Sequence, residues 1–299
     1  IVVNDFNAIE KFKIKNLTDI SKAIDKQILL ANELKKRNPK IKIIFFLLNK
    51  GKKNFYQKKI NRINNLFLKK SKNFNILDFD ISKLFTDYRF KQIYDKKNFK
   101  VSKTLYSEIA SIIIAKELSS FIYSLYFVKK KCLVLDLDNT LWGGVIGEDK
   151  LSQIKFGYSG KGLHFKKFQI YLKKLLKKGI ILAIASKNNF QDVRNFFKNK
   201  KMVLKLKDFS IVKANWEPKF KNLNEICKDL NIGKESVVFF DDSPFEREQM
   251  KKLNPKINII NVPRDPGKYI DAIEETSFFY SRNITKEDIK KRKQYDIIR

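Results

Sequence analysis

The sequence predicts an α/β protein built around a parallel sheet, and three observations support this class. Continuous apolar runs at 133–135, 180–185 and 237–240 have the length and composition of buried strands. Polar residues follow each run directly, as they do at the carboxyl ends of strands in open α/β sheets. Amphipathic stretches at helical spacing separate the runs, so crossover helices would connect parallel strands.

The first of these runs leads straight into two acidic residues. Residues 133–135 are followed by Asp136-Leu137-Asp138-Asn139-Thr140. Side chains two apart on an extended chain point the same way, so Asp136 and Asp138 should face one small volume beyond the strand. Two close carboxylates are unfavourable unless a metal ion, a shared proton or a lysine compensates them. We therefore expect the chemistry of the protein at this strand end.

The second run is reached through an irregular segment and a helix. Residues 141–149 contain three glycines and are too irregular for a helix. A helix that Gly179 ends is then predicted by apolar residues at helical spacing, namely Phe165, Phe168, Leu172, Leu175 and Leu176. The strand at 180–185 follows and ends at Ser186-Lys187-Asn188-Asn189. A hydroxyl group is thus expected at the same edge of the sheet as the carboxylates.

A lysine begins the next predicted helix. Asn215-Trp216-Glu217-Pro218-Lys219 opens a helix with the apolar face Phe220, Leu223, Ile226 and Leu230. The helix dipole disfavours a cation in the first turn, so an anionic ligand would account for Lys219. The strand at 237–240 then ends at Asp241-Asp242-Ser243-Pro244. Polar groups are therefore expected at three strand ends and at one helix start, all near the carboxyl edge of the sheet.

Each of these residues also has a structural interpretation. Asp242-Ser243-Pro244 fits a helix N-cap followed by proline at the first helical position. Ser186 alone would be a loop residue, Lys219 alone a solvated lysine, and Trp142 is either core or pocket wall. We favour the catalytic interpretation because capping explains one site and not the coincidence of four.

The order Asp-x-Asp-x-Thr, Ser, Lys and Asp-Asp resembles the four motifs of the haloacid dehalogenase (HAD) superfamily of phosphoryl-transfer enzymes. Within it, four segments resemble the FkbH-like branch, subfamily IIIC: Lys131–Asp149, Ser186–Asn189, Trp216–Lys219 and Phe240–Glu248. The resemblance is close from residue 130 onward and loose before it. It implies a HAD-like Rossmannoid parallel sheet domain preceded by a partial SGNH-like α/β domain.

The resemblance also assigns roles. It makes Asp136 the nucleophile that forms an aspartyl-phosphate, which divides one difficult displacement into two easier ones. Asp138 would act as general acid and then general base, which requires a raised pKa. Ser186 and Lys219 would hold the phosphoryl oxygens. Thr140 would brace the loop through hydrogen bonds, and Asn139 would support the same loop.

Hard oxygen ligands suit Mg²⁺, the cofactor that the resemblance implies. The expected ligands are Asp136, the backbone carbonyl of Asp138, and either Asp242 or Asp241, with Asp242 preferred. The reaction would be Mg²⁺-dependent phosphatase or phosphotransferase chemistry on a phosphorylated small molecule.

The FkbH-like resemblance implies a finer activity, in which a phosphorylated three-carbon acid is dephosphorylated and its glyceryl group passes to an acyl-carrier-protein thiol. Relatives often place a cysteine before the motif serine, whereas this sequence has Ala185, and Cys132 at a buried strand is a poor substitute. The alternatives are a nucleic-acid end phosphatase and a non-catalytic scaffold that docks a carrier protein. A scaffold would need none of the acidic motif residues.

The net charge and the amino-acid composition indicate which kinds of binding partner to expect. The net charge is +32, but lysine far outnumbers arginine and is spread along the chain, as AT-rich coding produces. A nucleic-acid partner is therefore disfavoured, although a basic surface would still steer phosphorylated substrates or an acidic carrier protein. The two cysteines form no disulfide or zinc pattern, and His164 is expected to be structural.

The chain should form two domains and a tail: a partial SGNH-like domain at 1–129, a HAD-like domain at 130–276, and a helical tail at 277–299. Before residue 130, strands are expected at 41–48 and 74–79 and helices at 21–36, 56–68 and 102–126. This domain lacks histidine, so no Ser-His pair can form and it should position a substrate or partner.

We expect the chain to be a fragment, because Ile1-Val2-Val3 resembles the interior of a strand and a helix begins near Thr285. By the resemblance, that helix would lead to a further acyltransferase-like domain. The apolar stretch 109–128 carries Lys116 and Glu117, so we expect a packed helix and not a membrane span. The expected location is the cytoplasm.

Overall fold

A computed structural model describes residues 17–47, 57–74, 76–85, 90–93, 95, 97, 101, 106–149 and 153–281. The chain divides into two compact units, Ile1–Ser119 and Ser120–Arg299. The expected strand at 1–3 and the expected helix near Thr285 lie outside the described residues.

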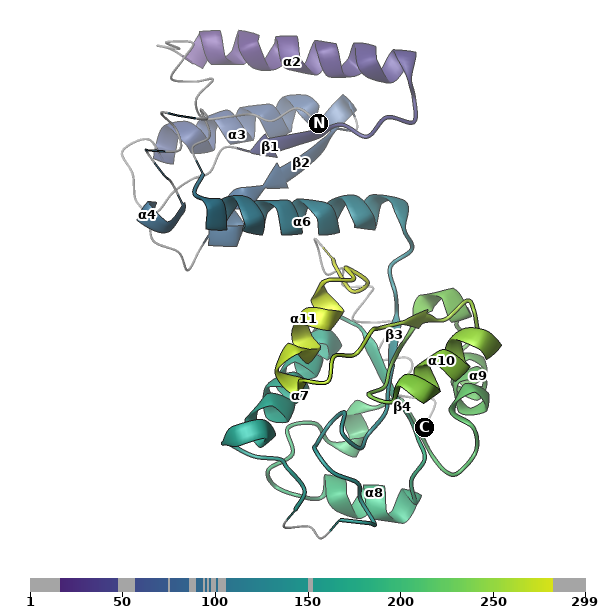
Figure 1. Ribbon diagram of the computed structural model, residues 1–299. Coiled ribbons are helices and arrows are strands. Elements are labelled where there is room, and N and C mark those ends of the chain that lie inside the picture. The colour runs from purple at the N-terminus through teal and green to yellow at the C-terminus, as the bar shows by residue number, and fades with distance from the viewer. Residues whose placement is uncertain are drawn as a thin grey trace. The chain divides into compact units, whose positions relative to one another are not determined.

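The N-terminal unit is a small α/β arrangement with a two-stranded parallel sheet. Its elements are α2 Leu17–Arg37, β1 Ile44–Leu47, α3 Gln57–Ser71, β2 Leu77–Asp80, α4 Phe90–Ile93 and the start of α6 Glu108–Tyr126 (Figure 1). Apolar side chains of α2, β1 and α3 form the core, in which the rings of Phe45 and Phe67 lie 4.7 Å apart. The predicted alternation of helices and strands in this region is confirmed.

The C-terminal unit is built on a five-stranded parallel sheet with the order β5-β4-β3-β6-β7. The strands are β3 Cys132–Leu135, β4 Ile181–Ser186, β5 Ile211–Ala214, β6 Val237–Phe240 and β7 Asn258–Ile259. The three strands that the sequence predicts, β3, β4 and β6, occupy the centre of this sheet, which confirms the parallel α/β class. The two strands that it does not predict, β5 and β7, form the edges.

Helices cover both faces of this sheet (Figure 1). They are α7 Gly160–Lys177, α8 Phe190–Phe197, α9 Lys219–Asp229, α10 Pro244–Leu253 and α11 Tyr269–Glu274. Alternate residues of a strand point to opposite faces. Leu133 and Leu135 therefore pack in the core with α7, α8 and α11, whereas Cys132 and Val134 pack in the core with α9 and α10. Both faces of β3 are buried, which leaves its carboxyl end as the place where polar groups can meet a ligand.

The helix α6 differs from the sequence-based expectation. Among the described residues it is the one helix long and apolar enough to cross a membrane, but only 17% of its apolar window is buried in the structure. Ile109 and Ile112 are each 61% exposed. The expected helix is present, and Ala110 and Phe121 are buried, but most of its other residues are half-buried or exposed. Apolar composition does not reveal how much of a helix a partner surface covers.

Candidate active site

The strand ends of β3, β4 and β6 bring the sequence-predicted residues together. In the sheet, Leu135 pairs with Ile184 on one side and with Phe240 on the other. The chain leaves β3 at Asp136, whose backbone N–H donates to the Phe240 carbonyl at 3.0 Å. Because parallel strands end at the same edge, Ser186 of β4 and Asp241 after β6 lie beside Asp136.

Asp136 is held by two buried side chains. Its Oδ1 accepts a hydrogen bond of 2.6 Å from the Ser186 hydroxyl, and its Oδ2 lies 3.0 Å from Lys219 Nζ. All three residues are buried. Burial lowers the pKa of Lys219, but the charges of Asp136 and Asp241 outweigh it and raise the pKa overall. Lys219 therefore stays cationic at the centre of the carboxylate cluster.

The neighbouring residues Asp241 and Asp242 lie in different surroundings. Asp241 is fully buried, and its Oδ2 accepts from Lys219 Nζ at 2.7 Å while its Oδ1 accepts from the Ser243 N–H at 2.9 Å. Asp242 is half-buried, and its carboxylate lies at the wall of a pocket. Burial and the charge of Asp136 raise the pKa of Asp242 to about 6, against the opposing charge of Lys219.

The capping interpretation of Asp242 does not hold in the structure. The N-cap of α10 is Ser243, whose hydroxyl accepts from the Glu246 N–H at 3.4 Å, and Pro244 is the first helical residue. Neither aspartate carboxylate caps the helix. The side chain of Asp242 thus has no capping role that would account for its place here.

Asp138 lies beside this cluster and accepts three hydrogen bonds. Its Oδ1 accepts from Trp142 Nε1 at 2.8 Å and from the Ile146 N–H at 3.1 Å. Its Oδ2 accepts from Asn188 Nδ2 at 2.8 Å. Burial raises the pKa of Asp138, while these hydrogen bonds act in the opposite direction. The raised pKa has the direction that a general acid requires.

Trp142 belongs to the core and not to a pocket wall. Its side chain is fully buried and packs on Phe196 with ring centroids 4.6 Å apart. Its indole N–H is one of the three groups that donate a hydrogen bond to Asp138. The sequence left both locations open, and the structure shows a core residue that also orients a site residue.

The loop after β3 is closed through its backbone and through Asn139. Asn139 adopts the left-handed region at φ 52°, and its Oδ1 accepts from the Gly144 N–H at 2.9 Å. Among the described residues the Thr140 hydroxyl is buried without a hydrogen-bond partner, although the Thr140 N–H donates to the Leu137 carbonyl at 3.1 Å. Thr140 therefore contributes to this loop through its backbone N–H and not through its hydroxyl.

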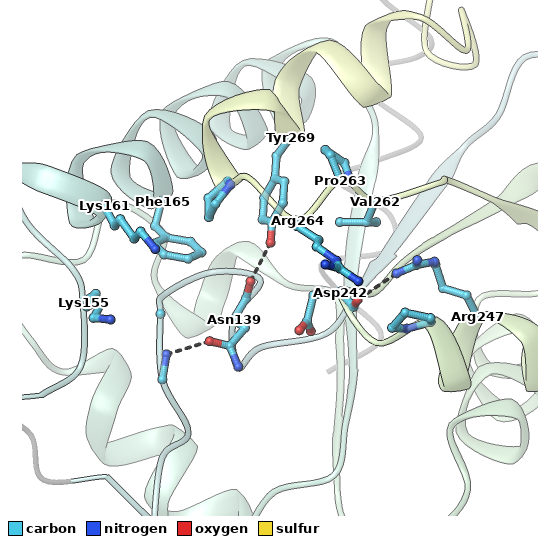
Figure 2. Close-up of a pocket in the computed structure, with 14 residues that line it drawn as sticks. Asn139, Lys155, Lys161, Phe165, Asp242, Arg247, Val262, Pro263, Arg264 and Tyr269 are labelled. Atoms are coloured by element: carbon cyan, nitrogen blue, oxygen red, sulfur yellow. Dashed lines mark hydrogen bonds between the residues drawn. The ribbon is translucent and has the colours of Figure 1, made fainter.

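A pocket of about 680 Å³ lies next to the carboxylates (Figure 2). Its walls come from the loop after β3, the start of α7, the start of α10, and the segment between β7 and α11. Tyr269 is part of this wall and donates its hydroxyl to the Asn139 carbonyl at 2.8 Å. A substrate in this pocket would lie beside Asp242 and the loop that carries Asp138.

Three residues of the site were not assigned a role from the sequence. Asn188 joins Asp138 and Ser186, since its Nδ2 also lies 3.1 Å from the Ser186 hydroxyl. Arg247 Nη1 donates to the carbonyls of Asp241 and Asp242 at 2.7 and 2.8 Å. The place of Asn188, two residues after the end of β4, was a usable signal, because polar groups gather at the carboxyl ends of parallel strands. Arg247 lies in the segment Phe240–Glu248 that carries the family resemblance, but nothing in the sequence assigned it a role, and no comparable signal marks Tyr269.

The donor set suits a hard metal ion. Carboxylate oxygens of Asp136, Asp241 and Asp242 lie within 4.8 Å of one another. Mg²⁺ takes one or two carboxylates together with waters and phosphate oxygens. The residues present therefore fit this ion.

Comparisons with known proteins point to phosphatases. A family model described as NLI interacting factor-like phosphatase matches residues 131–284. The N-terminal part of the protein BF1531 from Bacteroides fragilis, which contains a phosphatase domain and was crystallised with Mg, is 29% identical and has a TM-score of 0.62; the match covers 94% of this chain and 78% of that chain. A HAD-like phosphatase from Mesorhizobium loti, 13% identical, matches 52% of this chain and 91% of that chain with a TM-score of only 0.31. No curated protein matches significantly in sequence.

Proposed function

The chain belongs to the NLI interacting factor-like phosphatase family, and from this premise we propose that it hydrolyses phosphate monoesters through an aspartyl-phosphate formed on Asp136. One observation carries the proposal. The Asp136 carboxylate is held on one oxygen by the Ser186 hydroxyl and faces the Lys219 ammonium with the other. A nucleophile fixed beside a buried cation is suited to attack on phosphorus, because the cation offsets charge on the transferring group.

In the proposed first step, an Asp136 carboxylate oxygen forms a bond to phosphorus as the bond to the leaving oxygen breaks. Asp138 gives its proton to that oxygen. In the second step, Asp138 takes a proton from water, which attacks the aspartyl-phosphate and releases inorganic phosphate. Ser186 and Lys219 would hold the phosphoryl oxygens throughout.

We propose that Mg²⁺ is held by Asp136, the backbone carbonyl of Asp138, and Asp242. The hydrogen bonds of Asp241 support this choice, because both of its carboxylate oxygens are engaged by Lys219 and the Ser243 N–H. Asp241 would then orient Lys219. When bound, Mg²⁺ would neutralise phosphate charge and polarise the transferring group. The Mg in the Bacteroides fragilis structure is consistent with this proposal.

The finer FkbH-like activity, with a glyceryl group loaded on an acyl carrier protein, finds less support in the site. Such a transfer needs a capturing thiol, and the chain has two cysteines. Cys132 is fully buried inside β3, and burial raises the pKa of its thiol. Cys227 belongs to α9 and packs in the core. We therefore propose water as the acceptor, and keep an SGNH-like substrate-positioning role for the N-terminal unit as a separate proposal.

Hydrolysis of a generic phosphate ester by the purified chain, with and without Mg²⁺, tests the proposed function. Asp136→Asn keeps the shape of the side chain and removes its nucleophilic oxygen. We expect Mg²⁺-dependent release of phosphate by the parent and a loss of about a thousandfold or more in the variant. Equal rates in the two proteins would exclude Asp136 as the nucleophile. A parent that is inactive with Mg²⁺ would favour the scaffold alternative.

A further inference from the structure

We infer that Asn188 is a positioning residue that aims the proton of Asp138 at the leaving oxygen and ties this acid to the nucleophile. The inference rests on the proposed function, because it concerns the protonation of the leaving group in the first step. It adds a role for a side chain that is neither the nucleophile, nor the acid, nor a proposed metal ligand. Asn188 should therefore matter for esters whose leaving group needs a proton, and little for those whose leaving group departs as an anion.

The end of β4 and the start of α8 hold Asn188 in place. It lies two residues beyond Ser186, the last residue of β4, and is 4% exposed. The next residue, Asn189, is the N-cap of α8, and its side chain accepts from the Gln191 N–H at 2.8 Å. A strand end on one side and a capped helix on the other therefore fix the backbone that carries Asn188.

The side-chain amide of Asn188 donates to two residues of the site. Its Nδ2 lies 2.8 Å from Asp138 Oδ2 and 3.1 Å from the Ser186 hydroxyl. Ser186 in turn donates its hydroxyl proton to Asp136 Oδ1 at 2.6 Å. Because that proton is already used, Ser186 can only accept from Asn188, so the nitrogen of the amide and not its oxygen must face the hydroxyl. One amide group thus links the acid to the hydroxyl that holds the nucleophile.

The two carboxylate oxygens of Asp138 are occupied differently. Oδ1 accepts from Trp142 Nε1 and from the Ile146 N–H, which uses both of its lone pairs. Among the described residues, the one donor to Oδ2 is Asn188. A proton on Asp138 therefore has room on Oδ2 and not on Oδ1. Since Asn188 occupies one lone pair of Oδ2, the proton is left with the other, which fixes the line along which it is delivered.

This placement of the proton matters in the first step of the proposed reaction. Asp136 forms its bond to phosphorus while the bond from phosphorus to the leaving oxygen breaks. The electron pair of the broken bond stays on that oxygen, and the proton from Asp138 Oδ2 joins it, so an alkyl leaving group departs as a neutral alcohol. Without the amide of Asn188, the carboxyl group of Asp138 is held at one oxygen and can turn about its Cβ–Cγ bond, a torsion with broad minima.

Two phosphate esters of similar size test the inference. 4-Nitrophenyl phosphate loses a phenolate, which departs without protonation, whereas 4-nitrobenzyl phosphate loses an alcohol that needs a proton. The quantity compared is kcat/KM with Mg²⁺, because it reports the departure of the leaving group and not the later hydrolysis of the aspartyl-phosphate. We expect Asn188→Ala to lower kcat/KM about tenfold to a hundredfold for the benzyl ester, and less than about threefold for the phenyl ester.

Asn188→Leu repeats the test without a cavity, since leucine has nearly the shape of asparagine but no donor. It should give the same selective loss. The matched control is Asn189→Ala, which removes the neighbouring asparagine and the cap of α8. This control should lower the melting temperature and leave the ratio between the two esters at the parent value. A selective loss in Asn189→Ala as large as in Asn188→Ala would overturn the inference, because the ratio would then follow the stability of this loop.

Asp136→Asn separates this inference from the proposed function. If the parent hydrolyses both esters and Asp136→Asn hydrolyses neither, the proposed function holds. Equal losses for the two esters in the Asn188 variants, or no loss, would then overturn the inference alone. A parent that hydrolyses only the phenyl ester would do the same, since no leaving group would be receiving a proton. A parent inactive toward both esters, or an Asp136→Asn variant as active as the parent, would overturn the proposed function and the inference with it.

Discussion

The two units of the chain use the same architecture with different results. Both contain parallel strands, β1 and β2 in the first unit and β3 to β7 in the second. Among the described residues, however, the one group of three possible metal ligands is Asp136, Asp241 and Asp242, in the second unit. A parallel sheet is thus a scaffold, and the side chains at its strand ends make a site.

The site at the strand ends distinguishes the second unit from the first, and removal of its buried cation should have the largest effect on activity and stability. We expect Lys219→Met to lower kcat by about a hundredfold or more, because it removes the charge that faces the transferring phosphoryl group. It should also destabilise the second unit by about 3–5 kcal/mol, since Asp136 and Asp241 lose their partner. Steady-state kinetics and thermal unfolding measure both.

Lys221→Met is the control for this variant. Lys221 lies on the same helix, but its side chain is 58% exposed and pairs with Glu217 at the surface. It should leave kcat and stability near the parent values. Similar losses in the two variants would show that α9 depends on its overall charge and not on Lys219.

Core substitutions test whether the two units are energetically separate. Phe45→Ala in the first unit and Phe168→Ala in the second both empty a fully buried position. Each should cost about 3–5 kcal/mol. We expect Phe45→Ala to lower one unfolding transition while phosphatase activity persists, whereas Phe168→Ala should reduce stability and activity together. Loss of activity in Phe45→Ala would show that the first unit supports the site directly.

A smaller effect is expected from the indole N–H that orients Asp138. Trp142→Phe keeps an aromatic ring against Phe196 and removes the donor to Asp138 Oδ1. We expect kcat to fall about tenfold with little change in KM, as one hydrogen bond to a charged group is lost. Trp216→Phe, at a position 74% exposed, is the matched control. Equal kcat in Trp142→Phe and the parent would show that the hydrogen bonds from Asn188 and from the Ile146 N–H are sufficient to orient Asp138.

The smallest effect concerns the thiols. Burial raises the pKa of both Cys132 and Cys227, so little thiolate is present at pH 8. We expect both to react with a disulfide reagent far more slowly in the native protein than in the unfolded chain. Fast labelling of one thiol, accompanied by loss of activity, would revive the proposal of transfer to a carrier protein.

The sequence predicts the centre of the second sheet and misses its edges for a physical reason. Strands β3, β4 and β6 are buried on both faces and therefore appear as continuous apolar runs. The edge strand β5 contains Lys213, which pairs with Glu225 at 2.8 Å, and β7 has two residues. Polar edge strands and short strands give no such run.

The same limit on prediction from the sequence applies to the residues of the site. Asp136, Ser186 and Asp241 are recognisable because they follow apolar runs. They lie close together because the carboxyl ends of parallel strands are at the same edge of the sheet. Arg264 and Tyr269 come from the segment after β7, and their position in the pocket depends on how that segment packs. The exposure of apolar side chains on α6 could not be predicted either, because its sequence resembles that of a core helix.

Chemical trapping of the covalent intermediate would show whether Asp136 is the nucleophile. The chain would be mixed with Mg²⁺ and a phosphate ester, quenched in acid, and reduced with borohydride, which converts an aspartyl-phosphate to homoserine. We expect homoserine at position 136 and nowhere else, and none after reaction of Asp136→Asn. Turnover of the ester without homoserine at position 136 would contradict this expectation, and would mean that water attacks phosphorus without a covalent aspartate.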